Sequence, residues 1–256
     1  MVTPHIFTPE YYERLGRLEQ YHPWAGYMQR LAFALLDLHS PGAPLRVLDA
    51  GCGAGHFTEL WREHSRIPVA VGLDSAIEAL RVSRRRGVLR LAAGSVADLP
   101  FRGAVFDALY CADVLQHLEA PAAVRTLGEF ARVLRRGGLL LVRTAARRGL
   151  GSKRHRDTGD YQQWEPEKLR AQLEPRGFEI LWMSLVNWLP SLAADLRAWR
   201  RPAPAGDVGL GVALAPVSGL SWALLEAYWW MEQIGLLRLR WRLPGGHTLL
   251  CLARKQ

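Results

Sequence analysis

The sequence predicts an α/β protein built on a largely parallel sheet. Short apolar runs of strand length, among them residues 45–48 and 69–73, alternate with stretches in which apolar residues recur at helical spacing. The first run closes on an acid and three alternate glycines, Asp49, Gly51, Gly53 and Gly55. A buried strand that turns into a helix through such a loop is typical of α/β folds that bind a nucleoside-bearing ligand.

The glycine loop narrows the choice of ligand. Gly51 and Gly53 permit a positive φ and leave no Cβ between a ligand and the backbone, while residues 57–61 resume as a helix whose first amides face the loop. A dinucleotide fingerprint needs a third glycine where helix and strand pack closely, and this chain has the bulky His56 there. The loop therefore favours a nucleoside cofactor other than a nicotinamide dinucleotide.

The second strand, residues 69–73, ends at Asp74. An acid roughly 20 residues beyond a glycine loop can accept the hydroxyls of a ribose. Asp74 can also cap a helix that starts near Ser75, and one carboxylate can serve both purposes. A third run, residues 88–92, leads to Ser95 and Val96.

The order of these motifs resembles class I S-adenosylmethionine-dependent methyltransferases, in particular the type 11 methyltransferase domain. The resemblance continues through a fourth strand with its loop at residues 105–118, and through a helix, a glycine turn and a fifth strand at residues 130–142. It implies a Rossmann-like seven-stranded sheet whose seventh strand is antiparallel. For that strand and the sixth, residues 247–254 and 178–186 have suitable patterns, with a helix expected at residues 165–174.

The resemblance implies S-adenosylmethionine as the cofactor. In that family the acid and the glycine loop hold the methionine part, the acid after the second strand holds the ribose, and the segment around Ser95 frames the adenine. The loop after the fourth strand, where Cys111 is expected, contacts the methionine end. The expected cofactor-binding residues are Asp49, Ala50, Gly51, Cys52, Gly53, Gly55, Asp74, Ser95, Val96 and Cys111.

The flanks are expected to carry acceptor specificity. Residues 1–40 contain two helices interrupted near Pro23, which form either a lid over the cofactor, as in relatives, or a packed flank. Residues 41–186 and 247–256 would form the cofactor-binding core, and residues 187–246 an insertion between strands six and seven.

The insertion contains or borders six of the ten tryptophans. It suits a cap over an apolar acceptor, a plain packed subdomain, or an element that rests on lipid. Arg238, Arg240 and Arg242 alternate with apolar residues and would line one face of a strand. Residues 208–225 carry no charge and approach the lower length limit of a membrane span, but their glycines and proline make a poor transmembrane helix.

Composition restricts the partners. The net charge of +9 comes almost entirely from arginines, which are spread along the chain. Nucleic-acid binding calls for a continuous basic stripe with stacking aromatics, so this charge does not favour nucleic acid as a partner. The three cysteines form no C-x-x-C pair, which argues against a disulfide framework or a metal site and suits the cytoplasm. No secretory signal is visible at residues 1–10.

The resulting hypothesis is a cytoplasmic methyltransferase that acts on a small-molecule or lipid-like acceptor, with oxygen as the favoured target and peripheral membrane contact left open. An acceptor hydroxyl needs a base, and His117 and His155 are the candidates. Two alternatives are an NAD(P)-dependent oxidoreductase and a non-catalytic module that binds S-adenosylmethionine. The acceptor, the methylated element and the oligomeric state stay open.

Overall fold

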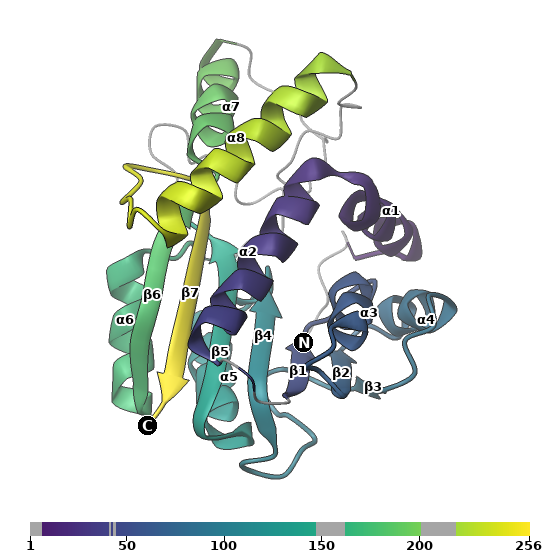
Figure 1. The fold of residues 1–256 in the computed structure, drawn as a ribbon. Coiled ribbons are helices and arrows are strands. Elements are labelled where there is room, and N and C mark those ends of the chain that lie inside the picture. The colour runs from purple at the N-terminus through teal and green to yellow at the C-terminus, as the bar shows by residue number, and fades with distance from the viewer. Residues whose placement is uncertain (1–6, 41, 43–44, 147–161, 201–218) are drawn as a thin grey trace.

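The sheet positions the site. The computed structural model describes residues 7–40, 42, 45–146, 162–200 and 219–256. Its strands are β1 (Arg46–Ala50), β2 (Val69–Asp74), β3 (Leu91–Ala93), β4 (Phe106–Ala112), β5 (Leu134–Ala145), β6 (Phe178–Val186) and β7 (Thr248–Lys255). They form one seven-stranded sheet in the order β3-β2-β1-β4-β5-β7-β6 (Figure 1). The first five pair in parallel and β7 runs antiparallel to β5 and β6, which confirms the predicted fold class.

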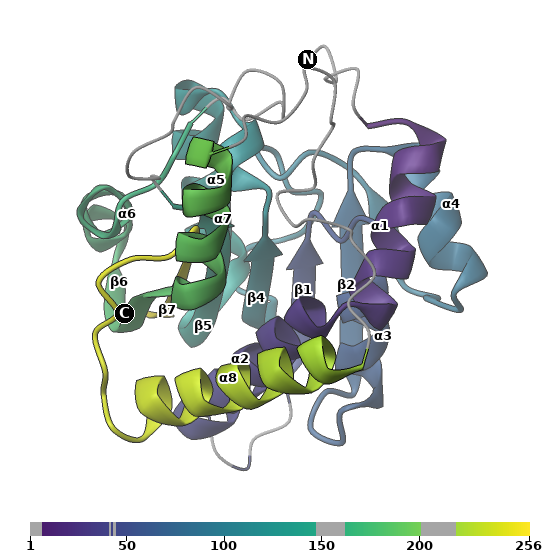
Figure 2. The ribbon, with the colours of Figure 1, turned by 90° about the horizontal axis from the view of Figure 1, so that it is seen from above.

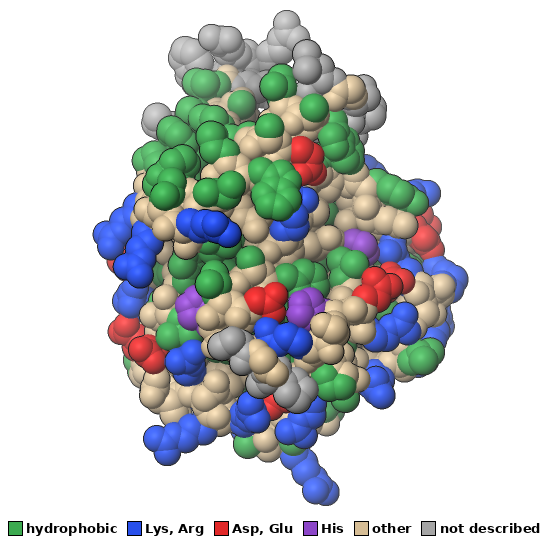
Figure 3. Space-filling view, in the orientation of Figure 1, with side chains coloured by type: hydrophobic (Ala, Val, Ile, Leu, Met, Phe, Trp, Pro, Cys, Tyr) green, Lys and Arg blue, Asp and Glu red, His purple; other side chains and the backbone are tan. Residues whose placement is uncertain are grey.

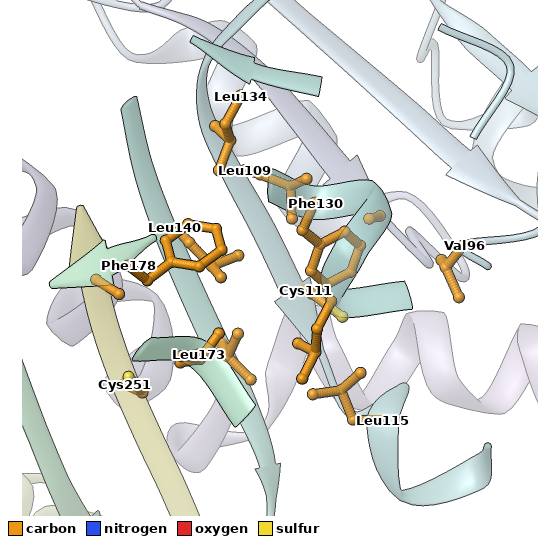
Figure 4. Packing of buried hydrophobic residues seen from close by; sticks show 14 of the residues in the cluster. Val96, Leu109, Cys111, Leu115, Phe130, Leu134, Leu140, Leu173, Phe178 and Cys251 are labelled. Carbon is orange, nitrogen blue, oxygen red and sulfur yellow. The ribbon is translucent and has the colours of Figure 1, made fainter. Parts of the chain in front are cut away.

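Helices cover both faces of this sheet. They are α1 (Pro9–Tyr21), α2 (Pro23–His39), α3 (His56–Glu63), α4 (Ile77–Arg85), α5 (Ala120–Val133), α6 (Pro166–Leu173), α7 (Trp188–Arg200) and α8 (Leu220–Leu237), with 3-10 turns η1 (Leu115–His117) and η3 (Glu174–Arg176). Helices α2, α3 and α8 pack on one face, and α5 and α6 on the other (Figure 2). Figure 4 shows the second layer, where Phe130 and Leu173 meet Leu140 and Phe178 of the sheet.

Most predicted elements lie where the apolar pattern placed them. The sixth strand has the predicted bounds, and the first extends to Ala50. The two N-terminal helices do separate at Pro23, because His22 is extended (φ −88°, ψ 130°) and its Nδ1 accepts the amide of Trp24 at 3.1 Å. The third strand begins three residues later than predicted, at Leu91.

The N-terminal helices and the insertion are joined through one buried carboxylate. Glu232 of α8 is 1% exposed and accepts hydrogen bonds from the Tyr27 hydroxyl of α2 at 2.6 Å and from the Trp188 amide at 3.1 Å. Tyr27 also stacks on Trp229, with ring centroids 5.7 Å apart. Glu232 therefore ties α2, α7 and α8 into one layer over the sheet.

The insertion between β6 and β7 contains α7 and α8, as predicted. The strand considered for residues 238–242 is wrong, because the chain turns there after α8 and Arg240 adopts a φ of +54°. Within the described residues, which omit 201–218, no helix combines the length and apolarity needed to cross a membrane.

Candidate functional site

The strand order reverses direction between β1 and β4. From β1 the chain proceeds outward to β2 and β3, and then returns to place β4 on the other side of β1. In open α/β sheets, ligands bind in the crevice outside the carboxyl ends of the strands at such a switch point. The predicted glycine loop lies directly there, at the carboxyl end of β1.

All three loop glycines have a positive φ, as predicted for Gly51 and Gly53. Gly51, Gly53 and Gly55 have φ values of +84°, +53° and +80°. A Cβ on Gly51 would lie 2.2 Å from Val114 Cγ2, and one on Gly55 would lie 2.6 Å from Ser83 Oγ. At Gly51 and Gly55 the backbone thus lies so close to neighbouring side chains that only glycine fits.

Asp74 links the glycine loop to the turn that precedes α4. One carboxylate oxygen accepts the amide of Gly53 at 2.9 Å, and the other accepts the amide of Ala76 at 2.9 Å, just before α4. Burial raises the pKa of Asp74, while these amides lower it. The carboxylate therefore faces the glycine loop. It does not cap α4, whose N-cap residue is Ala76 and which has no side-chain cap hydrogen bond, so the helix cap considered for this acid is wrong.

Asp49 is almost completely buried at the carboxyl end of β1, being 3% exposed. Its Oδ2 accepts the Thr58 hydroxyl of α3 at 2.6 Å. Burial raises the pKa of Asp49 to about 7, with the charge of Asp74 adding to the rise and the Thr58 hydrogen bond opposing it. An unneutralised carboxyl in this position favours a ligand that brings positive charge.

The residues expected around the adenine lie on the same edge. Ser95 and Val96 follow β3, which pairs with β2 beside Asp74, and the Gly94 amide donates to the Asp74 carbonyl at 3.0 Å. The Ser95 hydroxyl accepts the amide of Ala97 at 3.2 Å. The structure thus brings the carboxyl ends of β1, β2 and β3 together at one edge of the sheet.

Three other expected contact residues are buried in the interior. Ala50 and Cys52 are 0% and 6% exposed, and burial raises the pKa of the Cys52 thiol. Cys111 lies within β4 and packs in the core beside Phe130 and Leu115, where the sequence placed it in the following loop (Figure 4). Strand β4 continues to Ala112, so the loop begins with Asp113.

Helix α1 lies over the glycine loop. Leu15 Cδ2 would be 3.3 Å from a Cβ on Gly53, and Tyr12 is buried against Ala54. Arg86, just after α4, fixes this arrangement by donating to the Gly16 carbonyl at 2.6 Å. Burial and then the nearby Asp74 raise the pKa of Tyr12.

The histidines have separate environments. His117 ends η1, and its ring meets Phe7 edge-on with centroids 5.3 Å apart, so the N-terminal segment covers it. His155 lies outside the described residues. His56 begins α3 and is 8% exposed, and its Nδ1 lies 3.5 Å from Arg86 Nη1. Burial and then Arg86 lower the pKa of His56 to about 4.

Two groups of residues near the loop were not predicted from the sequence, namely Thr58, and Arg143 with Glu19. Thr58 gave a local signal, since it lies in the first turn of the helix after the loop, where its hydroxyl can reach back to Asp49. Arg143, which is buried, and Glu19, whose Oε2 is buried, gave none, because each is a single charged residue in an amphipathic or apolar element.

Comparisons with known proteins agree with this geometry. A family model described as "Methyltransferase domain" matches residues 48–142. The chain is 36% identical over 114 residues to a malonyl-[acyl-carrier protein] O-methyltransferase of Pectobacterium atrosepticum, covering 44% of this chain and 42% of that protein. It is 35% identical over 125 residues to a ubiquinone biosynthesis O-methyltransferase of Xylella fastidiosa, covering 44% and 48%. The aligned regions span less than half the length of these relatives.

Solved structures resemble the whole chain. A Thermotoga maritima protein described as a S-adenosylmethionine-dependent methyltransferase, possibly acting on histamine, gives a TM-score of 0.60 at 17% identity, covering 98% of this chain and 99% of that one. A methyltransferase-like protein from Haloferax volcanii, solved with its activator, gives 0.63 at 18% identity, covering 96% and 94%. At such identities the likeness shows the fold.

Proposed function

We propose that this chain, which carries a class I methyltransferase domain at residues 48–142, transfers a methyl group from S-adenosylmethionine to an oxygen of a small-molecule or lipid-like acceptor. The observation that carries the proposal is the glycine loop at the β1–β4 switch point, flanked by the carboxylates of Asp49 and Asp74. The names of two relatives, both O-methyltransferases, support oxygen as the target.

The residues at the crevice fit this cofactor. S-adenosylmethionine carries a sulfonium and an amino group, and burial has raised the pKa of both Asp49 and Asp74, so a nearby cation would restore their charged forms. The cofactor also brings two ribose hydroxyls, which suit an acid at the end of β2. We propose that Ala50, Cys52, Ser95 and Val96 contact the cofactor through their backbone or by van der Waals packing.

The bound cofactor supplies an electrophilic methyl carbon, so most of the protein's contribution is alignment and exclusion of water. We assign the exclusion of water to α1, which already covers the glycine loop through Tyr12 and Leu15. This makes residues 1–40 a lid, residues 41–186 and 247–256 the core, and residues 187–246 the acceptor-side cap. His117, and His155 beyond the described residues, are the candidate bases for an acceptor hydroxyl.

Calorimetry of the full chain with S-adenosylhomocysteine and with NAD tests the proposed cofactor. We expect binding of S-adenosylhomocysteine and no heat from NAD, because His56 stands where a dinucleotide site needs glycine. Binding of NAD alone would favour an oxidoreductase and contradict the proposal. Binding of S-adenosylhomocysteine without methyl transfer to any acceptor in a radiolabel screen would favour a non-catalytic module.

The cap carries an apolar outer surface that we assign to lipid contact. Large side chains are exposed along α8 and the turn after it (Figure 3), namely Trp222, Leu224, Trp230, Met231, Ile234 and Trp241. Arg238, Arg240 and Arg242 are exposed in the same turn. Tryptophan beside arginine favours the interface of an anionic membrane.

Sedimentation with vesicles tests the lipid contact. We expect the chain to sediment with phosphatidylglycerol-containing vesicles in a salt-sensitive way, and the Trp230→Ser/Trp241→Ser variant to bind at least fivefold less. The control is Leu89→Ser, which removes a 67%-exposed apolar residue from a loop outside the cap and should bind normally. Sedimentation that is absent, or equal for both variants, would remove the membrane assignment.

A further inference from the structure

Arg143 is a buried arginine near the carboxyl end of β5. Its side chain is 5% exposed, and its guanidinium lies 4.8 Å from the ring centroid of Trp24 in α2 and 5.5 Å from that of Phe57 in α3. These contacts place it on the sheet face that carries Asp49. Because neighbouring strands are about 4.8 Å apart and β4 separates β5 from β1, Arg143 lies roughly 10 Å across the sheet from Asp49.

The guanidinium has more donors than partners. Its Nη2 donates to Asp113 Oδ2 at 2.6 Å, but Nε and Nη1 have no partner within the described part of the chain. Three further buried atoms nearby also lack partners, namely Glu19 Oε2, Tyr110 Oη and Trp24 Nε1. A buried polar group without a hydrogen bond costs free energy, roughly 1–3 kcal/mol in proteins, and such groups gather at one place here.

Nearly all of these atoms are donors. Arg143 Nε and Nη1 and Trp24 Nε1 can only donate, and the Tyr110 hydroxyl donates readily. Burial raises the pKa of Glu19 to about 8, with Arg143 opposing the rise, so this carboxyl is a donor at neutral pH as well. A cluster of donors is complementary to a group that has several acceptor oxygens and a negative charge.

The cluster retains its positive charge. Burial lowers the pKa of Arg143, but Asp113 and other neighbours more than compensate for this, and the net direction is upward. Burial also raises the pKa of Tyr110, so its hydroxyl stays protonated. Near neutral pH the cluster therefore consists of the Arg143 guanidinium, which pairs with Asp113, and several neutral donors.

We propose that Arg143, Glu19 and Tyr110 bind a carboxylate group of the methyl acceptor, an inference that rests on the methyl transfer proposed at the adjoining glycine loop. A carboxylate accepts up to about four hydrogen bonds, enough for both free donors of Arg143, the Tyr110 hydroxyl and the protonated Glu19. Trp24 and Phe57 enclose the guanidinium and exclude water, which strengthens the ion pair.

S-adenosylmethionine also has a carboxylate, but the acceptor is the better occupant. The amino-acid part of the cofactor is assigned to Asp49 and the glycine loop on β1, whereas Arg143 lies two strands further on. Helix α1 covers both places through Leu15 above the loop and Glu19 one turn later, so both ligands would be enclosed together.

Acetate is the simplest probe of this site. We expect sodium acetate to raise the melting temperature of the full chain more than sodium chloride at equal ionic strength or acetamide, its neutral isostere. In Arg143→Met the half-maximal acetate concentration should rise at least tenfold. Tyr110→Phe, which removes one donor, should raise it about fivefold without lowering the melting temperature of the free protein. The control Arg135→Met, at the amino end of the same strand, should respond like the wild type.

Cofactor affinities show whether the bound carboxylate belongs to the acceptor or to the cofactor. In Arg143→Lys, S-adenosylhomocysteine and 5′-methylthioadenosine, which lacks the amino-acid part, should each bind within threefold of their wild-type affinities. A tenfold loss for S-adenosylhomocysteine alone would give Arg143 to the cofactor and overturn the acceptor assignment. No acetate-specific stabilisation of the wild type, or the same stabilisation in Arg143→Met, would also overturn it. Failure of the wild type to bind S-adenosylhomocysteine would instead refute the proposed function.

Discussion

Replacement of Asp49 by asparagine is expected to weaken S-adenosylmethionine binding at least 100-fold while leaving the free protein as stable as the wild type, or more stable, at pH 8. The carboxyl of Asp49 is 3% exposed and its pKa is raised to about 7 because burial disfavours its charged form. Asparagine keeps the shape and the hydrogen bond to Thr58 but cannot become charged. It therefore removes both the attraction for a cation and the cost of burying the anion.

The sign of the pH dependence follows from the direction of this shift. The pKa of Asp49 is higher in the folded protein than in the unfolded chain, where it is about 3.9. The stability that the protonated form contributes is fully present below that lower value and is lost as the pH rises through about 7. The stability gain in Asp49→Asn should thus be larger at pH 8 than at pH 5. Cofactor affinity of the wild type should rise from pH 6 to pH 8, and this rise should be smaller in the variant.

Melting temperatures at pH 5 and pH 8, with calorimetry of S-adenosylmethionine binding, measure both effects. The matched control is Asp107→Asn, on the next strand at the opposite end of the sheet. Asp107 is 5% exposed but already pairs with Arg46 at 3.3 Å and Arg135 at 2.8 Å. Its loss should destabilise the protein and leave cofactor affinity unchanged. An Asp49→Asn variant that binds normally, or that unfolds far more easily at pH 8, would contradict the role assigned to Asp49.

The sequence predicts the strands well where they form largely apolar runs of six to nine residues. Residues 178–186 form β6 with the predicted bounds, and residues 69–73 form β2 with one further residue. The short edge strand β3 is displaced because it has only three residues, so its position depends on pairing with β2 rather than on an apolar run. Residues 238–242 alternate in polarity but pair with no strand among the described residues, and the chain turns there.

Some residues of the candidate site can be predicted from the local sequence pattern, and others cannot. The glycine loop, Asp49 and Asp74 are visible in the sequence because the two acids lie at the carboxyl ends of their strands and the loop follows β1 directly. The contact from Gly53 to Asp74 is a consequence of how the loop folds back, and no local pattern shows it. Arg143 reads as the polar end of an apolar strand, and its burial depends on Trp24 and Phe57 of separate helices covering that face.

Replacement of Gly51 by alanine is expected to reduce S-adenosylhomocysteine binding at least 100-fold and to lower the melting temperature by several degrees. Gly51 has a φ of +84°, which costs an alanine about 1–2 kcal/mol. In addition the new Cβ would lie 2.2 Å from Val114 Cγ2, so the loop after β4 would have to move. The same methyl group would stand on the backbone that the cofactor is proposed to approach.

Two further variants separate the backbone cost of the positive φ from the clash with Val114 and from the effect on cofactor binding. Gly137 has a similar φ of +77°, and no atom of the described residues lies within 4 Å of its Cβ position. Gly137→Ala should therefore show the backbone cost alone and bind normally. The double variant Gly51→Ala/Val114→Ala relieves the clash, since the atom 2.2 Å away is removed and the Val114 Cβ lies at 3.5 Å. It should recover much of the lost stability, as a double-mutant cycle would show, but not the affinity. Full recovery of affinity would mean that only the position of the β4 loop matters, and that bare backbone at residue 51 is not part of the cofactor site.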